Sequence, residues 1–183
     1  MPAQAHTQVR PYKSVTEVIP MTKLPYEFYH RPCLEVAREL VGKVLVHGDL
    51  RLRITETEAY CGESDTACHA SKGRTARTEV MYREAGTIYI YLCYGMHWML
   101  NIVTGEENEP EAVLIRACVE ADGPGKLTKH LGITGELNRK HICGDDLYVI
   151  DAAFQCEVIT DKRVGIAYAT PEDQAKQWRY KMQ

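Results

Sequence analysis

The segment GTIYIYLCYGMHWMLNIVTG, at residues 86–105, places two apolar runs on either side of a Tyr94-Gly95 step. Two such runs that meet at a turn-forming glycine predict a β-hairpin with its turn at Tyr94-Gly95. In the first run Tyr89 and Tyr91 alternate with aliphatic residues, so both phenol rings should lie on one face of the strand. Three tyrosines within six residues are many phenols to bury, which indicates that the rings face a ligand. A second small core with hydrogen-bonded hydroxyls is the alternative, and the pattern leaves it open.

Turn-forming residues divide the rest of the 183-residue chain into short apolar segments. Helical spacing of apolar residues predicts a helix over residues 31–43, and a Gly-Pro-Gly step predicts a shorter helix within 123–133. Residues 61–85 should form a loop or short helix, and strands are predicted at 43–60 (with a turn at 47–49), 111–120, 146–151, 156–160 and 163–169. Because strands dominate without regular βαβ alternation, we expect a single α+β domain on a mainly antiparallel sheet. It should span residues 21–183 after an irregular leader at 1–20.

Composition indicates a soluble globular protein, with 45% hydrophobic and 26% charged residues. No apolar run approaches the roughly 20 residues that cross a bilayer, and the first residues lack the apolar stretch of a secretory signal. We therefore expect no membrane partner. Seven cysteines are scattered along the chain without close pairing, which favours free thiols in a reducing cytoplasm: Cys33, Cys61, Cys68, Cys93, Cys118, Cys143 and Cys156.

The formal net charge of −3 argues mildly against nucleic acid, because proteins that bind the phosphate backbone usually carry a positive excess. Locally the pattern differs: basic residues gather at 72–83 and at 176–181, while glutamates gather at 106–111. A protein with this distribution could present one positive face. Charge scattered over a solvated surface explains the pattern equally well.

The strand RITETEAY carries two carboxylates that alternate with threonines. Alternation puts Ile54, Glu56, Glu58 and Tyr60 on one face, and an acid beside apolar groups needs a partner or a chemical role. One of the two glutamates could be a general base whose pKa is tuned by partial burial. On the strand alone, an edge strand with both glutamates in water is the favoured interpretation. Periodicity does not distinguish the two glutamates.

Two further polar residues stand out near the hairpin: His69 in CGESDTACHASKGRTART, and Asn101 among apolar neighbours after the turn. Aromatic rings with a nearby amide and a histidine suit a nucleobase pocket, through stacking and hydrogen bonds to the base edge. Zinc held by Cys61, Cys68 and His69 fits poorly, because no Cys-x-x-Cys pair is present. The sequence also lacks a nucleophile elbow, a phosphate loop and a dinucleotide-binding fingerprint, so we expect neither metal nor cofactor.

Together these segments resemble one family, the alkyladenine (3-methyladenine, methylpurine) DNA glycosylases. The resemblance extends over residues 24–180 in the same order, through RPCLEVARELVGKVLV, ITETEAY, HASKGRTART, GTIYIYLCYGMHWMLNIVTG, EAVLIRA, GPGKL, LGI and RVGIAYA. It implies a single domain with a curved sheet, flanking helices and a protruding hairpin, similar to the C-terminal domain of formyltransferases. Two departures, a short link at Ala121-Asp122 and a shortened SKGRTART loop, affect the expected DNA backbone contacts more than the chemistry.

The resemblance also implies roles for particular residues. Glu58 would be the general base for the attacking water, and Arg116 would hold Glu58 and the water in register. Tyr94 would wedge into the DNA stack. Arg74 and Arg77 would contact the DNA backbone. The base pocket would consist of Tyr60, His69 and Tyr91, which enclose the flipped base, and Asn101, which excludes the 2-amino group of guanine.

The implied activity is excision of 3-methyladenine, 7-methylguanine, hypoxanthine or ethenoadenine from double-stranded DNA. Water is the nucleophile, so an abasic site remains and the strand is not cut. We expect a monomer that works in the cytoplasm on a bacterial nucleoid, or in a eukaryotic nucleus. Two alternatives are a non-catalytic binder of flipped or single-stranded bases, for which Glu58 would be dispensable, and a hydrolase of free nucleosides, for which Tyr94 would be dispensable.

Overall fold

The computed structural model describes residues 22–183, so the predicted leader at residues 1–20 lies outside the described residues. Four short α-helices occur in this part of the chain: α1 (Tyr26–Tyr29), α2 (Cys33–Leu40), α3 (Pro124–Leu131) and α4 (Pro171–Ala175). The strands are β1 (Thr22–Lys23), β2 (Val44–His47), β3 (Leu50–Cys61), β4 (Ile88–Cys93), β5 (His97–Thr104), β6 (Glu111–Cys118), β7 (Ala121–Asp122), β8 (Leu147–Asp151), β9 (Val158–Asp161) and β10 (Arg179–Met182).

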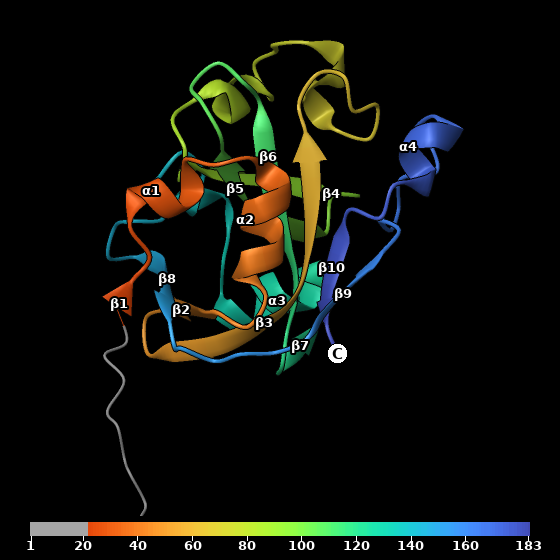
Figure 1. Ribbon diagram of the computed structural model, residues 1–183. Coiled ribbons are helices and arrows are strands. Elements are labelled where there is room, and N and C mark those ends of the chain that lie inside the picture. The colour runs from red at the N-terminus through yellow and green to blue at the C-terminus, as the bar shows by residue number, and fades with distance from the viewer. Residues whose placement is uncertain (1–21) are drawn as a thin grey trace, which may run out of the picture.

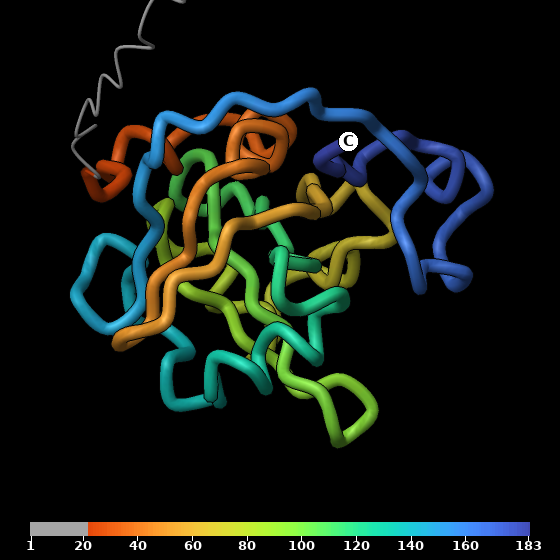
Figure 2. The backbone as a smooth tube through the Cα atoms, turned by 90° about the horizontal axis from the view of Figure 1, so that it is seen from below, coloured from red at the N-terminus to blue at the C-terminus, as the bar shows by residue number. Residues whose placement is uncertain are grey.

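The strands form one sheet in the order β1-β8-β2-β3-β6-β5-β4, with β10 pairing to β3 and β9, and β7 to β6. Each of these ladders is antiparallel. The sheet curls into a half-barrel with few helices against it (Figures 1 and 2). The predicted single α+β domain is confirmed, whereas the specific likeness to formyltransferase domains stays a prediction. No helix among residues 22–183 is long and apolar enough to cross a membrane.

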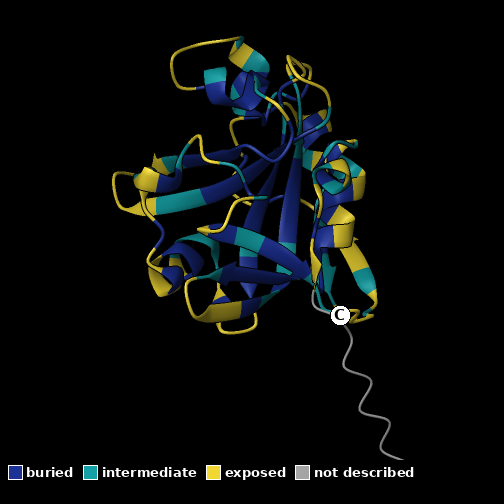
Figure 3. Cartoon of the chain, turned by 90° about the vertical axis from the view of Figure 1, so that its left-hand side faces the viewer, coloured by how far each residue is buried: buried dark blue, intermediate teal, exposed yellow. Residues whose placement is uncertain are grey.

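Helix α2 confirms the predicted helix but is shorter than expected. Cys33, Val36, Ala37 and Leu40 lie on one face and are buried, while Arg31 and Glu39 pair on the solvent side at 2.8 Å. Figure 3 shows the same division between buried and exposed faces in the helices at the edge of the sheet. The helix ends at Leu40, because the backbone of Val41 is extended and leads toward β2.

Strand β3 lies inside the sheet, with β2 and β10 on one side and β6 on the other. The edge-strand interpretation of its glutamates is therefore wrong. Strict alternation also fails, because register shifts occur on either side of Glu56 and the consecutive residues Thr57, Glu58 and Ala59 are all buried. Thr57 faces α2, where its hydroxyl donates to the carbonyl of Ala37 at 2.7 Å. Both faces of β3 are thus covered.

The predicted hairpin is formed by β4 and β5. Cys93 pairs with His97, and Tyr94 adopts a φ of +51° in the turn, where its side chain is 87% exposed. The tip projects from the body of the molecule (Figure 2). Along β4 the two isoleucines join the main core, whereas Tyr89 and Tyr91 pack on the opposite face, as the alternation predicted.

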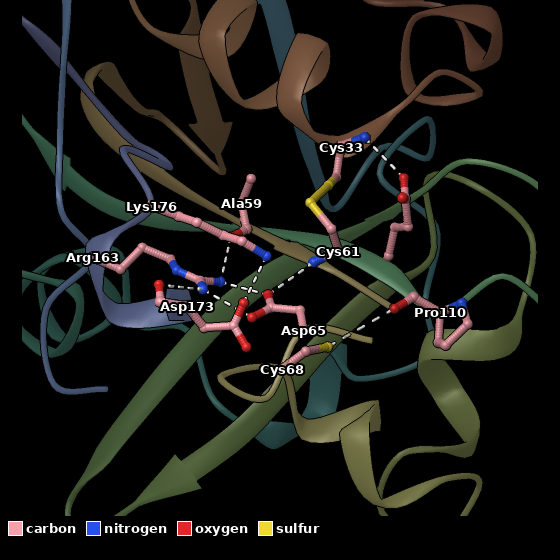
Figure 4. The surroundings of a disulfide bond; sticks show 10 residues. Cys33, Ala59, Cys61, Asp65, Cys68, Pro110, Arg163, Asp173 and Lys176 are labelled. Carbon is pink, nitrogen blue, oxygen red and sulfur yellow. Dashed lines mark hydrogen bonds and ion pairs between the residues drawn. A yellow bond between two sulfur atoms is a disulfide. The ribbon is translucent and has the colours of Figure 1, made fainter. Parts of the chain in front are cut away.

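Two further predictions are wrong. Residues 163–169 form bends and turns, not a strand, and β10, which no pattern indicated, pairs with β3 and β9. The strand predicted at 156–160 does form, as β9, with its bounds shifted to Val158–Asp161. Cys33 and Cys61 form a disulfide (Figure 4), so the expectation that all cysteines are free fails. The fold joins the first residue of α2 to the last residue of β3, a pairing that cysteine spacing alone does not indicate.

Candidate active site

Five aromatic side chains from different segments surround one cavity on the face of β4 turned away from the main core. The cavity between these side chains has a volume of about 30 Å³. The rings come from the end of β3, a short 3-10 helix (His69–Lys72), strand β4 and the segment before α4, and Asn101 lies on β5. The aromatic lining consists of Tyr60, His69, Tyr89, Tyr91 and Tyr168.

His69 packs against both tyrosines of β4. Its ring centroid lies 4.6 Å from that of Tyr91 in an edge-to-face arrangement, and its Nδ1 is 2.9 Å from the hydroxyl of Tyr89. Burial, with a contribution from the positive charge of Arg77, lowers the pKa of His69 to about 4. The imidazole is therefore neutral near pH 7, with one ring nitrogen donating and the other accepting hydrogen bonds.

Asn101 is held by the hairpin backbone. It faces Tyr89 across the β4–β5 ladder, and its Nδ2 donates to the carbonyls of Tyr89 at 3.1 Å and Met99 at 3.3 Å. These bonds fix the amide in a position where only 4% of the residue is exposed. The amide thus presents a rigid polar group in the cavity wall.

Glu58 is completely buried, at 0% exposure. Its Oε2 accepts a hydrogen bond from the hydroxyl of Tyr60 at 2.8 Å, and its Oε1 accepts one from the backbone N–H of Val164 at 2.8 Å. Burial raises the pKa of Glu58, while Arg116 and these two hydrogen bonds act in the opposite direction. A carboxyl in this balance is typical of a group that accepts and releases a proton.

The carboxylate and the cavity meet through Tyr60. Glu58 does not itself line the cavity, but the ring of Tyr60 does, and the hydroxyl of that ring is bound to Glu58. The two regions are therefore neighbours separated by one side chain. A ligand in the cavity would contact the ring whose hydroxyl is bound to the buried acid.

Arg116 on β6 lies between the two glutamates. Its Nε donates to Glu56 Oε1 at 2.8 Å, and its Nη1 lies 3.4 Å from Glu58 Oε1. Glu56 also pairs with Arg179 of β10 at 3.1 Å. Glu56 thus pairs with two arginines, whereas Glu58 accepts a hydrogen bond from Tyr60, whose ring lines the cavity. Strand periodicity could not make this distinction.

Sequence reasoning missed several residues of this region. Alternation places Tyr89 on the same ligand-facing side as Tyr91, but the resemblance implies no pocket role for it. Tyr168 lines the cavity and donates to the carbonyl of Ala67 at 2.7 Å. Arg163 stacks beneath Tyr60, with its guanidinium carbon 4.9 Å from the ring centroid. No local pattern indicated Tyr168 or Arg163, because their partners are about 100 residues away in the chain.

The remaining predicted residues lie outside the cavity. Arg77 is exposed at its rim, with its guanidinium carbon 5.2 Å from the centroid of Tyr91. Arg74 is also exposed and turns toward Tyr82, donating to Asn108 at 2.9 Å. Tyr94 is at the hairpin tip. The structure therefore brings Glu58, Tyr60, His69, Tyr91, Asn101 and Arg116 together, and leaves Tyr94, Arg74 and Arg77 on the surface around them.

A metal site at Cys61, Cys68 and His69 does not form. Among the described residues, the cluster of potential metal ligands is Cys33, Cys61 and Glu111. The first two of these are joined in the disulfide. The cysteine that adjoins the cavity, Cys68, lies apart from this cluster and its thiol faces the carbonyl of Pro110 at 3.9 Å.

The chain is similar to a family of known enzymes. Residues 27–121 and 119–183 match the family model described as Methylpurine-DNA glycosylase (MPG). A protein of Methanocella arvoryzae is 45% identical over 87% of this chain and 92% of its own length. Relatives from Myxococcus xanthus (46% identical, 81% of this chain, 84% of the relative) and Desulfitobacterium hafniense (42%, 87% and 95%) are similarly close. All three are provisionally named 3-methyladenine DNA glycosylases.

Proposed function

The chain belongs to the methylpurine-DNA glycosylase family and is therefore a DNA-repair glycosylase, and we propose that it flips alkylated or deaminated purines out of duplex DNA and releases them by hydrolysis. The observation that supports this most is the Tyr60–Glu58 hydrogen bond of 2.8 Å, which joins an aromatic cavity to a buried carboxylate. The substrates we propose are 3-methyladenine, 7-methylguanine, hypoxanthine and ethenoadenine.

The cavity is the proposed base pocket. The rings of Tyr60, His69 and Tyr91 offer π-faces and edges for a flipped purine, and His69 supplies a hydrogen bond at the base edge. Asn101 would collide with the 2-amino group of an undamaged guanine, because its amide is fixed by two backbone carbonyls. Unstacking costs a few kcal/mol and is easiest for a damaged or mispaired base, so extrusion is the first selection step.

Glu58 is the proposed general base. In its ionised form it accepts a proton from water as that water attacks the sugar carbon, and the bond to the base breaks with its electron pair leaving on the base. Each carboxylate oxygen has two lone pairs, so Oε2 can accept from water in addition to Tyr60. The negative charge also stabilises the cationic sugar of the transition state. Arg116 keeps the carboxylate oriented.

The charge of the damaged base determines whether the base must gain a proton before it leaves. An N3- or N7-methylated purine is already a cation and leaves as a neutral base. The phenol rings favour such a cation by about 0.5–2 kcal/mol. Hypoxanthine and ethenoadenine are neutral and require a proton on the base before departure. Since the products are a free base and an abasic site, the strand stays intact.

Double-stranded DNA is the proposed partner, and a monomer is the proposed state. Tyr94, at the exposed hairpin tip, would fill the gap left by the flipped nucleotide. Arg74 and Arg77 would bind phosphates beside the cavity. We place the protein with chromosomal DNA, which is in the cytoplasm in prokaryotes such as the source organisms of the relatives.

Excision from defined duplexes tests the proposal. Duplexes with one hypoxanthine, ethenoadenine or 7-methylguanine are incubated with the protein, and abasic sites are revealed by alkali on a gel. We expect cleavage only after alkali, and a loss of at least about 100-fold in Glu58→Gln, in the range of general-base contributions. Wild-type rates in Glu58→Gln would favour a non-catalytic binder contaminated by another activity, and nicking without alkali would exclude the water mechanism.

A further inference from the structure

Arg163 lies in the turn segment between β9 and α4, and its side chain is completely buried, at 0% exposure. Its guanidinium forms a two-pronged ion pair with Asp65, with Nη1–Oδ2 and Nη2–Oδ1 distances of 2.5 and 2.8 Å. Nη1 also donates to the carbonyl of Ala59 at 3.0 Å (Figure 4). The rings of Tyr60 and Trp178 each lie with their centroids 4.9 Å from the guanidinium carbon.

The partners of Arg163 directly adjoin the groups that bind Glu58. Ala59 precedes Tyr60, whose hydroxyl binds Glu58 Oε2 at 2.8 Å. Arg163 itself precedes Val164, whose N–H binds Glu58 Oε1 at 2.8 Å. One buried cation is therefore fixed next to both hydrogen-bond donors of the carboxylate.

The N–H of Val164 has no strand ladder to position it. Residues 163–169 form bends and turns, and Val164 is 48% exposed as a residue, so packing of its side chain fixes little. Asp65 supplies the anchor, because its Oδ2 accepts from the N–H of Cys61 at 3.1 Å and its Oδ1 from that of Ala67 at 3.1 Å. The ion pair thus attaches the turn segment to the end of β3.

We propose that Arg163 and Asp65 are positioning residues of the glycosylase site, which hold the Val164 N–H on Glu58 and the Tyr60 ring on the base pocket. The inference rests on the proposed function, since it takes Glu58 as the group that must be ionised. A donated N–H stabilises the ionised carboxylate relative to the protonated acid. The ion pair therefore keeps Glu58 active as a base to lower pH than its burial alone would allow.

The test is the pH dependence of single-turnover excision. In Arg163→Lys and Asp65→Asn the two-pronged pair is lost, so the acidic limb of the rate profile should move to higher pH by about 0.5 unit or more. Val164→Pro deletes the N–H itself and should move the limb in the same direction. Val164→Ala retains the N–H and should keep the limb in its wild-type position.

A stability control separates positioning from general loosening of the fold. Val149→Ala removes buried core volume on β8, remote from the ion pair, and lowers Tm without touching Glu58. If Val149→Ala shifts the limb as much as the ion-pair variants do at an equal loss of Tm, the proposal is overturned. It is also overturned if folded Arg163→Lys, Asp65→Asn and Val164→Pro keep the wild-type limb. The variants that fold decide between these outcomes. Wild-type activity in Glu58→Gln would contradict the proposed function itself, which is a different result from failure of this inference.

Discussion

The hydroxyl of Tyr60 donates a 2.8 Å hydrogen bond to Oε2 of Glu58, while the ring of the same tyrosine lines the aromatic cavity. One side chain thus belongs to both halves of the proposed site. Its ring can be kept while its hydroxyl is removed, so the coupling between pocket and carboxylate can be tested separately from stacking.

Tyr60→Phe should raise the pKa of Glu58 further, because burial already raises it and the hydroxyl bond is one of the interactions that opposes the rise. Activity requires the ionised acid and is lost as pH falls through that pKa. The acidic limb of the excision profile should therefore move to higher pH, with a larger loss of rate at pH 6 than at pH 8. Single-turnover rates from pH 5 to 9 measure this. A parallel loss at every pH would mean that the hydroxyl does not act through the carboxylate.

His69 should make stability depend on pH. Its pKa is lowered from 6.5 to about 4 in the fold, so the unfolded chain binds the proton more readily and stability falls as pH drops from about 6.5 to 4. The loss attributable to this residue is on the order of 3 kcal/mol. Denaturant unfolding at several pH values, compared with His69→Gln, isolates it. If the free energy of unfolding falls equally with pH in both proteins, the imidazole of His69 is not the cause of the pH dependence.

Tyr94→Ser should separate DNA engagement from folding. The side chain is 87% exposed at the hairpin tip, so the free energy of unfolding should change by less than about 0.5 kcal/mol. Excision from duplex DNA should fall, because the gap left by the flipped base is no longer filled, while excision from single strands should change little. An equal reduction on both substrates would contradict a wedge role.

The hairpin and the aromatic face were predictable from sequence because both follow from local rules. The period of two along β4 separates Tyr89 and Tyr91 from the isoleucines, and the glycine at the turn fixes where the chain reverses. By contrast, Glu56 and Glu58 differ through partners far along the chain. Arg179, which binds Glu56, is 123 residues away, so no window around the strand contains the information that distinguishes the two acids.

The error at residues 163–169 has a specific physical cause. Val164, Ile166 and Tyr168 alternate with other residues as in a strand, but the N–H of Val164 binds Glu58 where a strand would bind its neighbour. Arg163 in the same segment forms an ion pair with Asp65, which lies 98 residues earlier in the chain. The disulfide was missed for a similar reason, since Cys33 and Cys61 are 28 residues apart and meet only when α2 packs on β3.

The Cys33–Cys61 disulfide should contribute to stability by limiting the unfolded chain. Closing a loop of 28 residues is worth about 3.5 kcal/mol in the chain-entropy description. Cys33→Ser should therefore lower the free energy of unfolding by about that amount and remove its dependence on reductant. Cys93→Ser is a suitable control, because Cys93 is a free thiol. If reductant destabilises Cys33→Ser as much as Cys93→Ser, a different disulfide is present; if it destabilises neither, no disulfide is present.

Arg77 should influence which lesions are preferred. Its guanidinium lies 5.2 Å from the centroid of Tyr91, and its charge contributes to the lowered pKa of His69. Among residues 22–183 Arg77 takes part in no ion pair. An uncompensated cation at the rim disfavours a second cation in the cavity.

Arg77→Gln should therefore raise excision of cationic 7-methylguanine relative to neutral hypoxanthine by about three- to tenfold, equivalent to roughly 0.6–1.4 kcal/mol. Loss of a phosphate contact would reduce both rates alike and leave their ratio unchanged, so the ratio isolates the electrostatic effect. Arg74→Gln is the matched control, because Arg74 turns toward Tyr82 and Asn108 and away from the cavity. Arg74→Gln should weaken DNA binding and make that binding less dependent on salt. The ratio of 7-methylguanine excision to hypoxanthine excision should stay at its wild-type value. Equal ratios in both variants would show that the charge of Arg77 is screened from the base pocket.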